Sequence, residues 1–99
     1  MMEHRLDDRI HTPINVTIHT DKGDAFKARA NNLSRGGVNI DLEEIWVVEV
    51  NKLVIMEFME ERLHIKIPAL VLQTSENSAS LMFIEHSPEL HSFLSDLHR

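Results

Sequence analysis

The sequence "NLSRGG", residues 32–37, holds side chains that could bind a polar ligand. Asn32 offers an amide and Ser34 a hydroxyl, while Gly36 and Gly37 allow unusual backbone angles and leave the main chain open to a ligand. These residue types suit a planar or phosphorylated molecule. They are also the usual residues of a turn between two strands, and the motif alone leaves both interpretations open.

A second group of candidate binding residues lies near the N-terminus, where "RLDDR" places Arg5 and Arg9 four positions apart. A guanidinium binds phosphate through two hydrogen bonds, binds the O6 and N7 edge of guanine, and stacks on ring faces. Asp7 and Asp8 could instead pair with the arginines on a solvated segment, where ion pairs contribute little. The segment precedes the first expected strand, so we expect it to lie free of the core.

Composition narrows the class of protein. The chain has 99 residues, which suits one domain with a single modest core. Its formal net charge of −6 argues against DNA or RNA binding, because such proteins neutralise phosphates with many lysines and arginines. The absence of cysteine excludes disulfides, thiolate metal sites and cysteine nucleophiles. Any bound anion must therefore be held by a local group of cations.

The sequence gives little support for catalysis or for a metal site. Its seven histidines form no HxxxH or HExxH pattern, so we predict no bound metal. Ser34 has no base that the sequence identifies, and the paired carboxylates lie in expected turns or tails, where solvation is their usual role. We therefore expect a protein that is not an enzyme and needs no cofactor.

The apolar segments are short. Runs such as "IWVV" cannot cross a bilayer, and the N-terminal residues lack the apolar region of a signal peptide. We expect a cytoplasmic protein that does not insert into membranes. Trp46, the only tryptophan, lies in "EEIWVVEVN", which is ambiguous between a loop and a short helix. Its indole could pack in the core or anchor a partner.

Alternation of apolar and polar residues predicts six strands. The first two form a hairpin, and Pro68 in the fifth indicates an edge or a bulge. After the last strand the spacing of Leu90, Phe93 and Leu94 becomes helical, with Ser87 as N-cap and Pro88 as first helical residue. The expected strands span residues 13–20, 25–31, 38–42, 52–58, 62–74 and 80–85.

These elements predict an all-β fold, a closed or nearly closed six-stranded antiparallel β-barrel with a C-terminal α-helix. We expect one domain over residues 1–99. Within it we predict a flexible N-terminal arm over 1–11, the barrel over 12–85 and the helix over 87–98.

In this order, the two motifs resemble those of the PilZ domain, the bacterial receptor module for cyclic di-GMP. That family carries RxxxR near the start of the domain and [D/N]xSxxG one hairpin later. Arg5 and Arg9 match the first motif, and Asn32, Ser34 and Gly37 match the second. The fold of the family is a six-stranded barrel with a C-terminal helix, so the resemblance covers nearly the whole chain.

The resemblance implies that the chain binds cyclic di-GMP and relays this second messenger to an unidentified protein of motility, adhesion or secretion machinery. The arginines Arg5 and Arg9 would bind phosphates and the Hoogsteen edges of guanine. Asn32 and Ser34 would bind the ligand from the barrel, and Gly37 would leave room for it. The arm would become ordered on binding, and this new surface would be the signal.

Three further residues are candidates for the same site: His4, Arg35 and Gly36. Many family members have an arginine where this chain has His4, so the sequence leaves open whether one or two ligand molecules bind. The alternative function is that of a PilZ-like adaptor that binds proteins without a ligand, for example in type IV pilus assembly.

Overall fold

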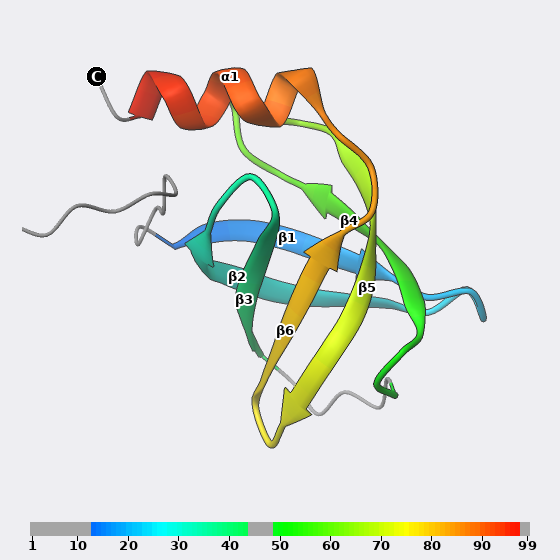
Figure 1. Cartoon of the computed structure of the whole chain (residues 1–99). Helices are drawn as coiled ribbons and strands as arrows, with labels where there is room; N and C mark the ends of the chain where they lie inside the picture. The colour runs from blue at the N-terminus through cyan, green and yellow to red at the C-terminus, as the bar shows by residue number, and fades with distance from the viewer. Residues whose placement is uncertain (1–12, 44–48, 98–99) are drawn as a thin grey trace, which may run out of the picture.

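The computed structural model describes residues 13–43 and 49–97, and in it six antiparallel strands close into a barrel. One helix lies at one end of this barrel (Figure 1). The expected fold class, an all-β barrel with a C-terminal α-helix, is confirmed. The elements are β1 (Ile14–His19), β2 (Ala25–Leu33), β3 (Gly37–Leu42), β4 (Leu53–Phe58), β5 (Lys66–Ser75), β6 (Ser78–Phe83) and α1 (Pro88–Leu97).

The strands follow one another around the barrel in the order β1-β2-β3-β6-β5-β4. Four of the contacts join strands that are consecutive in the chain, and the β3–β6 and β1–β4 contacts join strands that are far apart in it. Each strand therefore has a partner on both sides, and the barrel offers no free strand edge for another chain to pair with.

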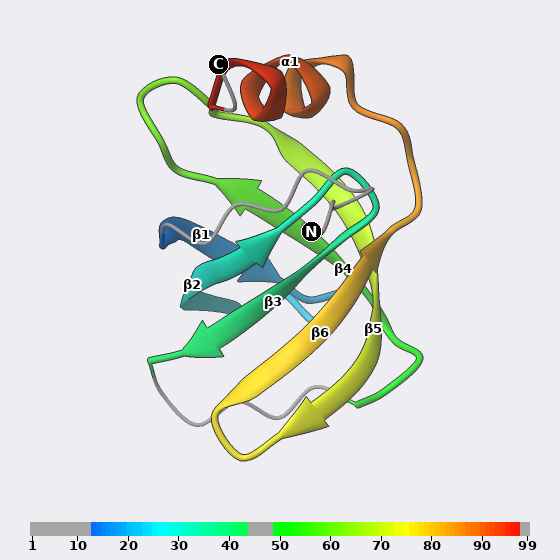
Figure 2. The ribbon, with the colours of Figure 1, turned by 60° about the vertical axis from the view of Figure 1, so that its left-hand side comes forward.

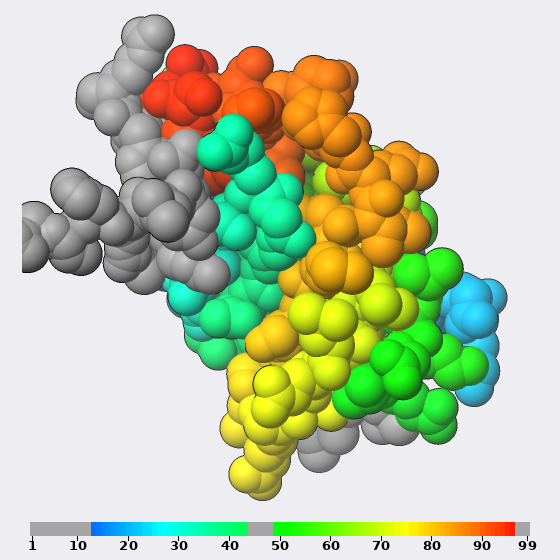
Figure 3. Space-filling view, in the orientation of Figure 1, coloured from blue at the N-terminus to red at the C-terminus, as the bar shows by residue number. Residues whose placement is uncertain are grey.

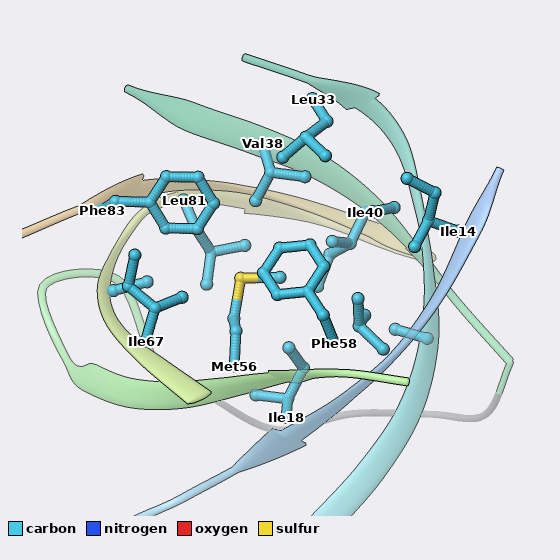
Figure 4. Close-up of a cluster of buried hydrophobic side chains, with 14 of the residues drawn as sticks. Ile14, Ile18, Leu33, Val38, Ile40, Met56, Phe58, Ile67, Leu81 and Phe83 are labelled. Atoms are coloured by element: carbon cyan, nitrogen blue, oxygen red, sulfur yellow. The ribbon is translucent and has the colours of Figure 1, made fainter. Parts of the chain in front are cut away.

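Alternate side chains of every strand fill the barrel. Met56 and Phe58 of β4 point into its centre, and the Phe58 ring lies 6.2 Å from that of Phe83 (Figure 4). Small residues, Ala28 and Ala30, occupy the inward positions of β2. The largest fully buried side chains are Phe58, Ile18, Leu33, Ile40, Met56, Leu81, Leu90, Leu94, Val16 and Val71.

The helix begins as the sequence predicts. The Leu90 backbone N–H donates to the Ser87 hydroxyl oxygen at 3.1 Å, and Pro88 is the first helical residue. Leu90, Phe93 and Leu94 are buried and extend the barrel core. The helix α1 has ten residues, and among the described residues no helix is long and apolar enough to span a membrane.

Two local expectations for the fifth strand are not met. The strand begins at Lys66, because the preceding residues form a tight turn in which Glu60 and Leu63 exchange backbone hydrogen bonds of 3.0 and 3.1 Å. The bulge of β5 lies between Val71 and Gln73 and not at Pro68. The Pro68 carbonyl accepts a hydrogen bond from the Ile84 N–H, just beyond the end of β6. The N–H that Pro68 lacks would therefore lie where the ladder between β5 and β6 has already ended. The segment 44–48, with Trp46, lies outside the described residues.

Gly37 allows β3 to lie close to β6. A Cβ atom on Gly37 would be 2.7 Å from the Leu81 carbonyl oxygen, a main-chain atom that cannot move aside easily. A Cβ on Gly36 would meet no atom within 4 Å. Neither residue has a positive φ, and Gly23 is the only described glycine that does. The expectation that this pair provides unusual backbone angles is therefore wrong, and Gly37 is required for space.

A histidine and carboxylate cluster lies across the contact between β1 and β4. The Nε2 atom of His19 donates to one oxygen of Glu57 at 2.9 Å, and Nε2 of His64 donates to the other at 3.0 Å. The hydrogen bond from His19, then that from His64, lowers the pKa of Glu57 below its ordinary value. The positive charge of Lys66 acts in the same direction, and partial burial of the carboxylate opposes it.

Replacing Gly37 by alanine should destabilise the fold by about 1–3 kcal/mol, because the new methyl group collides with the β6 backbone. The matched change Gly36→Ala enters open space and should alter stability by less than about 0.5 kcal/mol. Urea unfolding of the two variants compares them directly. Equal stabilities would contradict the role given to Gly37.

The Glu57→Gln variant should be less stable than the wild type at neutral pH, and the difference should shrink in acid. Since the pKa of Glu57 is lower in the folded chain than in the unfolded one, the ionised carboxylate stabilises the fold above the ordinary glutamate range. This stabilisation is lost as the pH falls through the lowered pKa. Thermal unfolding at a series of pH values measures the difference.

A control for this measurement is Glu76→Gln, which changes an exposed carboxylate in the turn between β5 and β6. Because the position is exposed, this change should alter stability by less than about 0.5 kcal/mol. A difference for Glu57→Gln that stays constant down to strong acid would show that this carboxylate acts through packing and not through its charge.

Candidate ligand-binding site

The turn between β2 and β3 holds the second motif. The Ser34 N–H donates to the Gly37 carbonyl at 2.9 Å, so Arg35 and Gly36 form the tip of a tight turn. The Gly36 carbonyl accepts from the Phe83 N–H of β6 at 3.0 Å, which fixes this tip to the barrel wall. The interpretation of "LSRGG" as a turn joining strands is thus confirmed, and the turn is anchored at both of its ends.

Ser34 is the buried polar residue of this turn. It is 7% exposed, and its hydroxyl donates to the Gly37 carbonyl at 3.3 Å. A hydroxyl that donates one hydrogen bond can still accept two. Ser34 therefore stabilises the turn, and its hydroxyl oxygen can accept further hydrogen bonds.

A bulge in β2 positions the asparagines. The pairing of β2 with β3 shifts between Ala30 and Asn32, so Asn31 is the extra residue. Bulges next to binding sites redirect side chains, and here Asn31 and Asn32 are both half-buried. The Asn31 amide donates to the Asp41 carboxylate, and Asn32 lies opposite Asn39 of β3.

A polar hollow of about 390 Å³ lies along β3, β6 and β5, and its lining includes Asn31, the residue that precedes the motif. Asn39 and Ser80 lie opposite each other in it, two residue pairs along from Gly37 and Met82, and the Ser80 hydroxyl donates to Asn39 Oδ1 at 2.8 Å. Amides and hydroxyls of this kind can bind base edges and phosphate oxygens. Other side chains that line the hollow are Asp41, Gln73, Thr74, Ser75 and Ser78.

Sequence reasoning did not identify this hollow. Its signal was present in the polar residues that alternate with core residues along β3 and β6, such as Asn39 and Asp41 around Ile40. Such alternation is common to all half-buried strands. Only the pairing of β3 with β6, which are distant in the chain, shows that these polar residues form one surface.

Arg35 at the tip of the turn reaches helix α1. Its Nη1 donates to Nε2 of His91 at 2.8 Å, and the His91 ring lies edge-on to the ring of His86 at 5.7 Å. A guanidinium can only donate, so this contact requires His91 to have an unprotonated Nε2. Figure 2 shows the turn directly below α1, as Figure 1 does. The candidate cation Arg35 is thus held at the helix.

The structure brings together some of the predicted site residues. Asn32 near the end of β2, Ser34 in the turn and Gly37 at the start of β3 lie on one hairpin. His4, Arg5 and Arg9 lie outside the described residues, so their place at this turn stays a prediction. In residues 13–43 and 49–97, no group of three or more histidine or carboxylate side chains is arranged to hold a metal ion.

Comparison with known proteins gives the family. The family model described as PilZ domain matches residues 3–97. No curated protein matches the chain.

Solved structures of similar fold include the PilZ domain of CeSA from a cellulose-synthesizing bacterium, with 14% identity, a TM-score of 0.75 and coverage of 92% of this chain and 98% of that one. The PilZ domain of YcgR from Escherichia coli, with c-di-GMP, is 18% identical, with a TM-score of 0.76 and coverage of 96% and 88%. The Bacillus subtilis inhibitor of motility MotI/DgrA is 16% identical, with a TM-score of 0.73. The match covers 97% of this chain and 50% of that one.

At these identities the solved structures show a shared fold, and the family model supplies the assignment. The model spans both motifs, the six strands and the helix. The chain therefore belongs to the PilZ domain family.

Proposed function

We propose that this chain is a cytoplasmic bacterial receptor for cyclic di-GMP that relays the messenger to a protein of motility, adhesion or secretion machinery. PilZ domains are a family of cyclic di-GMP receptor modules, and the YcgR domain of similar fold was solved with this ligand. The observation that supports the proposal most is that Asn32, Ser34 and Gly37 lie on one hairpin whose turn is bonded to β6. Asn32 lies opposite Asn39, which lines the polar hollow.

The turn suits a ligand that carries both bases and phosphates. Asn32 offers an amide donor and acceptor, and the Ser34 hydroxyl oxygen can accept hydrogen bonds while its hydrogen is donated to Gly37. The Gly36 carbonyl is already bonded to β6, so the exposed tip is stiff before a ligand arrives. A preformed turn of this kind lowers the entropy cost of binding.

Charge explains why the N-terminal arginines are needed. The chain carries a formal net charge of −6, and Asp41 lies in the polar hollow. A ligand with two phosphates would be repelled unless cations are brought to it. In the proposal Arg5 and Arg9 supply these cations, with Arg35 and His4 as further candidates. Asn32, in place of the aspartate found in many PilZ domains, adds no negative charge.

The proposed signal is a change of surface. Arg5 and Arg9 would close over the ligand, and the ordered arm would present a face that the free protein lacks. Ordering costs free energy, which the phosphate and guanine contacts of the arginines offset. In the alternative function, an adaptor that acts without ligand, the same barrel would bind its partner whether or not the messenger is present.

Isothermal titration tests the proposal. The chain should bind cyclic di-GMP and show no comparable affinity for GMP or cyclic di-AMP. Arg9→Ala and Ser34→Ala should each weaken binding at least about tenfold, which corresponds to about 1.4 kcal/mol.

The control for these variants is Arg62→Ala, which removes an exposed arginine that contacts Asp96 of the helix at 3.9 Å. This change should leave the affinity unchanged, and thermal unfolding should verify that Ser34→Ala remains folded. No binding by the wild type would refute the receptor function. Recovery of one partner protein with and without the messenger would then favour the adaptor.

A further inference from the structure

The outward side chains of β4, β5 and β6 form two apolar rows across the barrel wall. In the first row Leu53 lies opposite Leu70, which lies opposite Met82. In the second row Ile55 lies opposite Pro68, and the Pro68 carbonyl binds the Ile84 N–H. With Leu72, which follows Leu70 on the outer side of β5, these residues form what we call the apolar face: Leu53, Ile55, Pro68, Leu70, Leu72, Met82 and Ile84.

These side chains are not part of the core. Leu53 is 55% exposed, Leu72 48%, Ile84 45%, Met82 40% and Ile55 38%. The residues between them in the chain point inward and fill the barrel, as Val54 and Ala69 do. The apolar face therefore lies outside the core. Figure 3 shows the outer surfaces of β5 and β6 turned toward the viewer.

The exposed area of the apolar face is close to the apolar part of a typical protein interface. Five large apolar residues that are each close to half exposed amount to roughly 400 Å² of surface, within the range of functional patches on small proteins. A stable interface buries about 800 Å² on each partner, and somewhat more than half of that area is apolar. The face thus supplies about the apolar share of one such interface.

The charges around the face favour a second copy of the same chain. All seven positions are uncharged, so two chains of net charge −6 can meet there without placing like charges in contact. Each end of the face carries both signs. Glu57 lies opposite Lys66 beyond Ile55, and Glu49 adjoins Lys52 beyond Leu53. A boundary with both signs can complement itself in a two-fold symmetric dimer.

The closed barrel limits how copies can associate. Every strand already has two neighbours, so a second chain cannot add a strand to an edge. Contact must therefore be between faces of the barrel wall, and the apolar face is such a surface on β4, β5 and β6. From these observations we propose that two copies of this chain form a symmetric dimer through the apolar face. This inference does not depend on ligand binding.

Sedimentation velocity of the full chain, from about 10 μM to about 1 mM, tests the dimer. We expect the sedimentation coefficient to rise from that of a monomer to that of a dimer. Met82→Lys and Leu53→Lys should each weaken association at least tenfold, because each places a charge at one end of the apolar row that runs through Leu70. Both positions are exposed in the monomer, so neither change should unfold it.

A matched control is available in Met59→Lys. Met59 is 47% exposed and lies two residues after Glu57, beyond the charged end of the face, and it receives the same substitution as Met82. The Met59→Lys variant should dimerise like the wild type. A wild type that stays monomeric throughout, or an equal effect of Met59→Lys and Met82→Lys, would overturn the proposal. So would amide NMR shifts on dilution that lie away from β4, β5 and β6.

Discussion

The contact between β3 and β6 is the constraint on which the rest of this structure depends. Two three-stranded units, β1–β2–β3 and β4–β5–β6, become one barrel only where β3 meets β6 and β1 meets β4. At the upper end of the first contact Gly37 lies against the Leu81 main chain, where no side chain fits. The hydrogen bond from Phe83 to Gly36 then holds the neighbouring turn. One glycine thus serves both closure of the barrel and placement of the motif.

The strands and the helix could be predicted because their signals are local. Alternation along the chain located all six strands, and Ser87 with Pro88 located the helix start. The start of β5 and the bulges could not be predicted in the same way. They depend on how many residues the partner strand offers, and a bulge such as that at Asn31 exists only relative to β3.

The candidate site was predicted in part. The motif identified Asn32, Ser34 and Gly37, yet it gave the wrong physical reason for the glycines, since the lack of space at Gly37 comes from a strand more than forty residues later in the chain. The polar hollow was not predicted at all. The contact of Ser80 with Asn39 that lines it joins residues 41 positions apart.

Closure by distant strands also has a consequence for folding kinetics. Val38 pairs with Leu81 and Val16 pairs with Phe58, so the chain must close loops of about forty residues before these two ladders contribute. A barrel with such a high contact order folds slowly for its length, on timescales of the order of milliseconds to seconds. Until β3 and β6 meet, the two three-stranded units expose unpaired strand edges to the surrounding solution. The last ladder to form therefore determines how long a newly made chain stays open to aggregation.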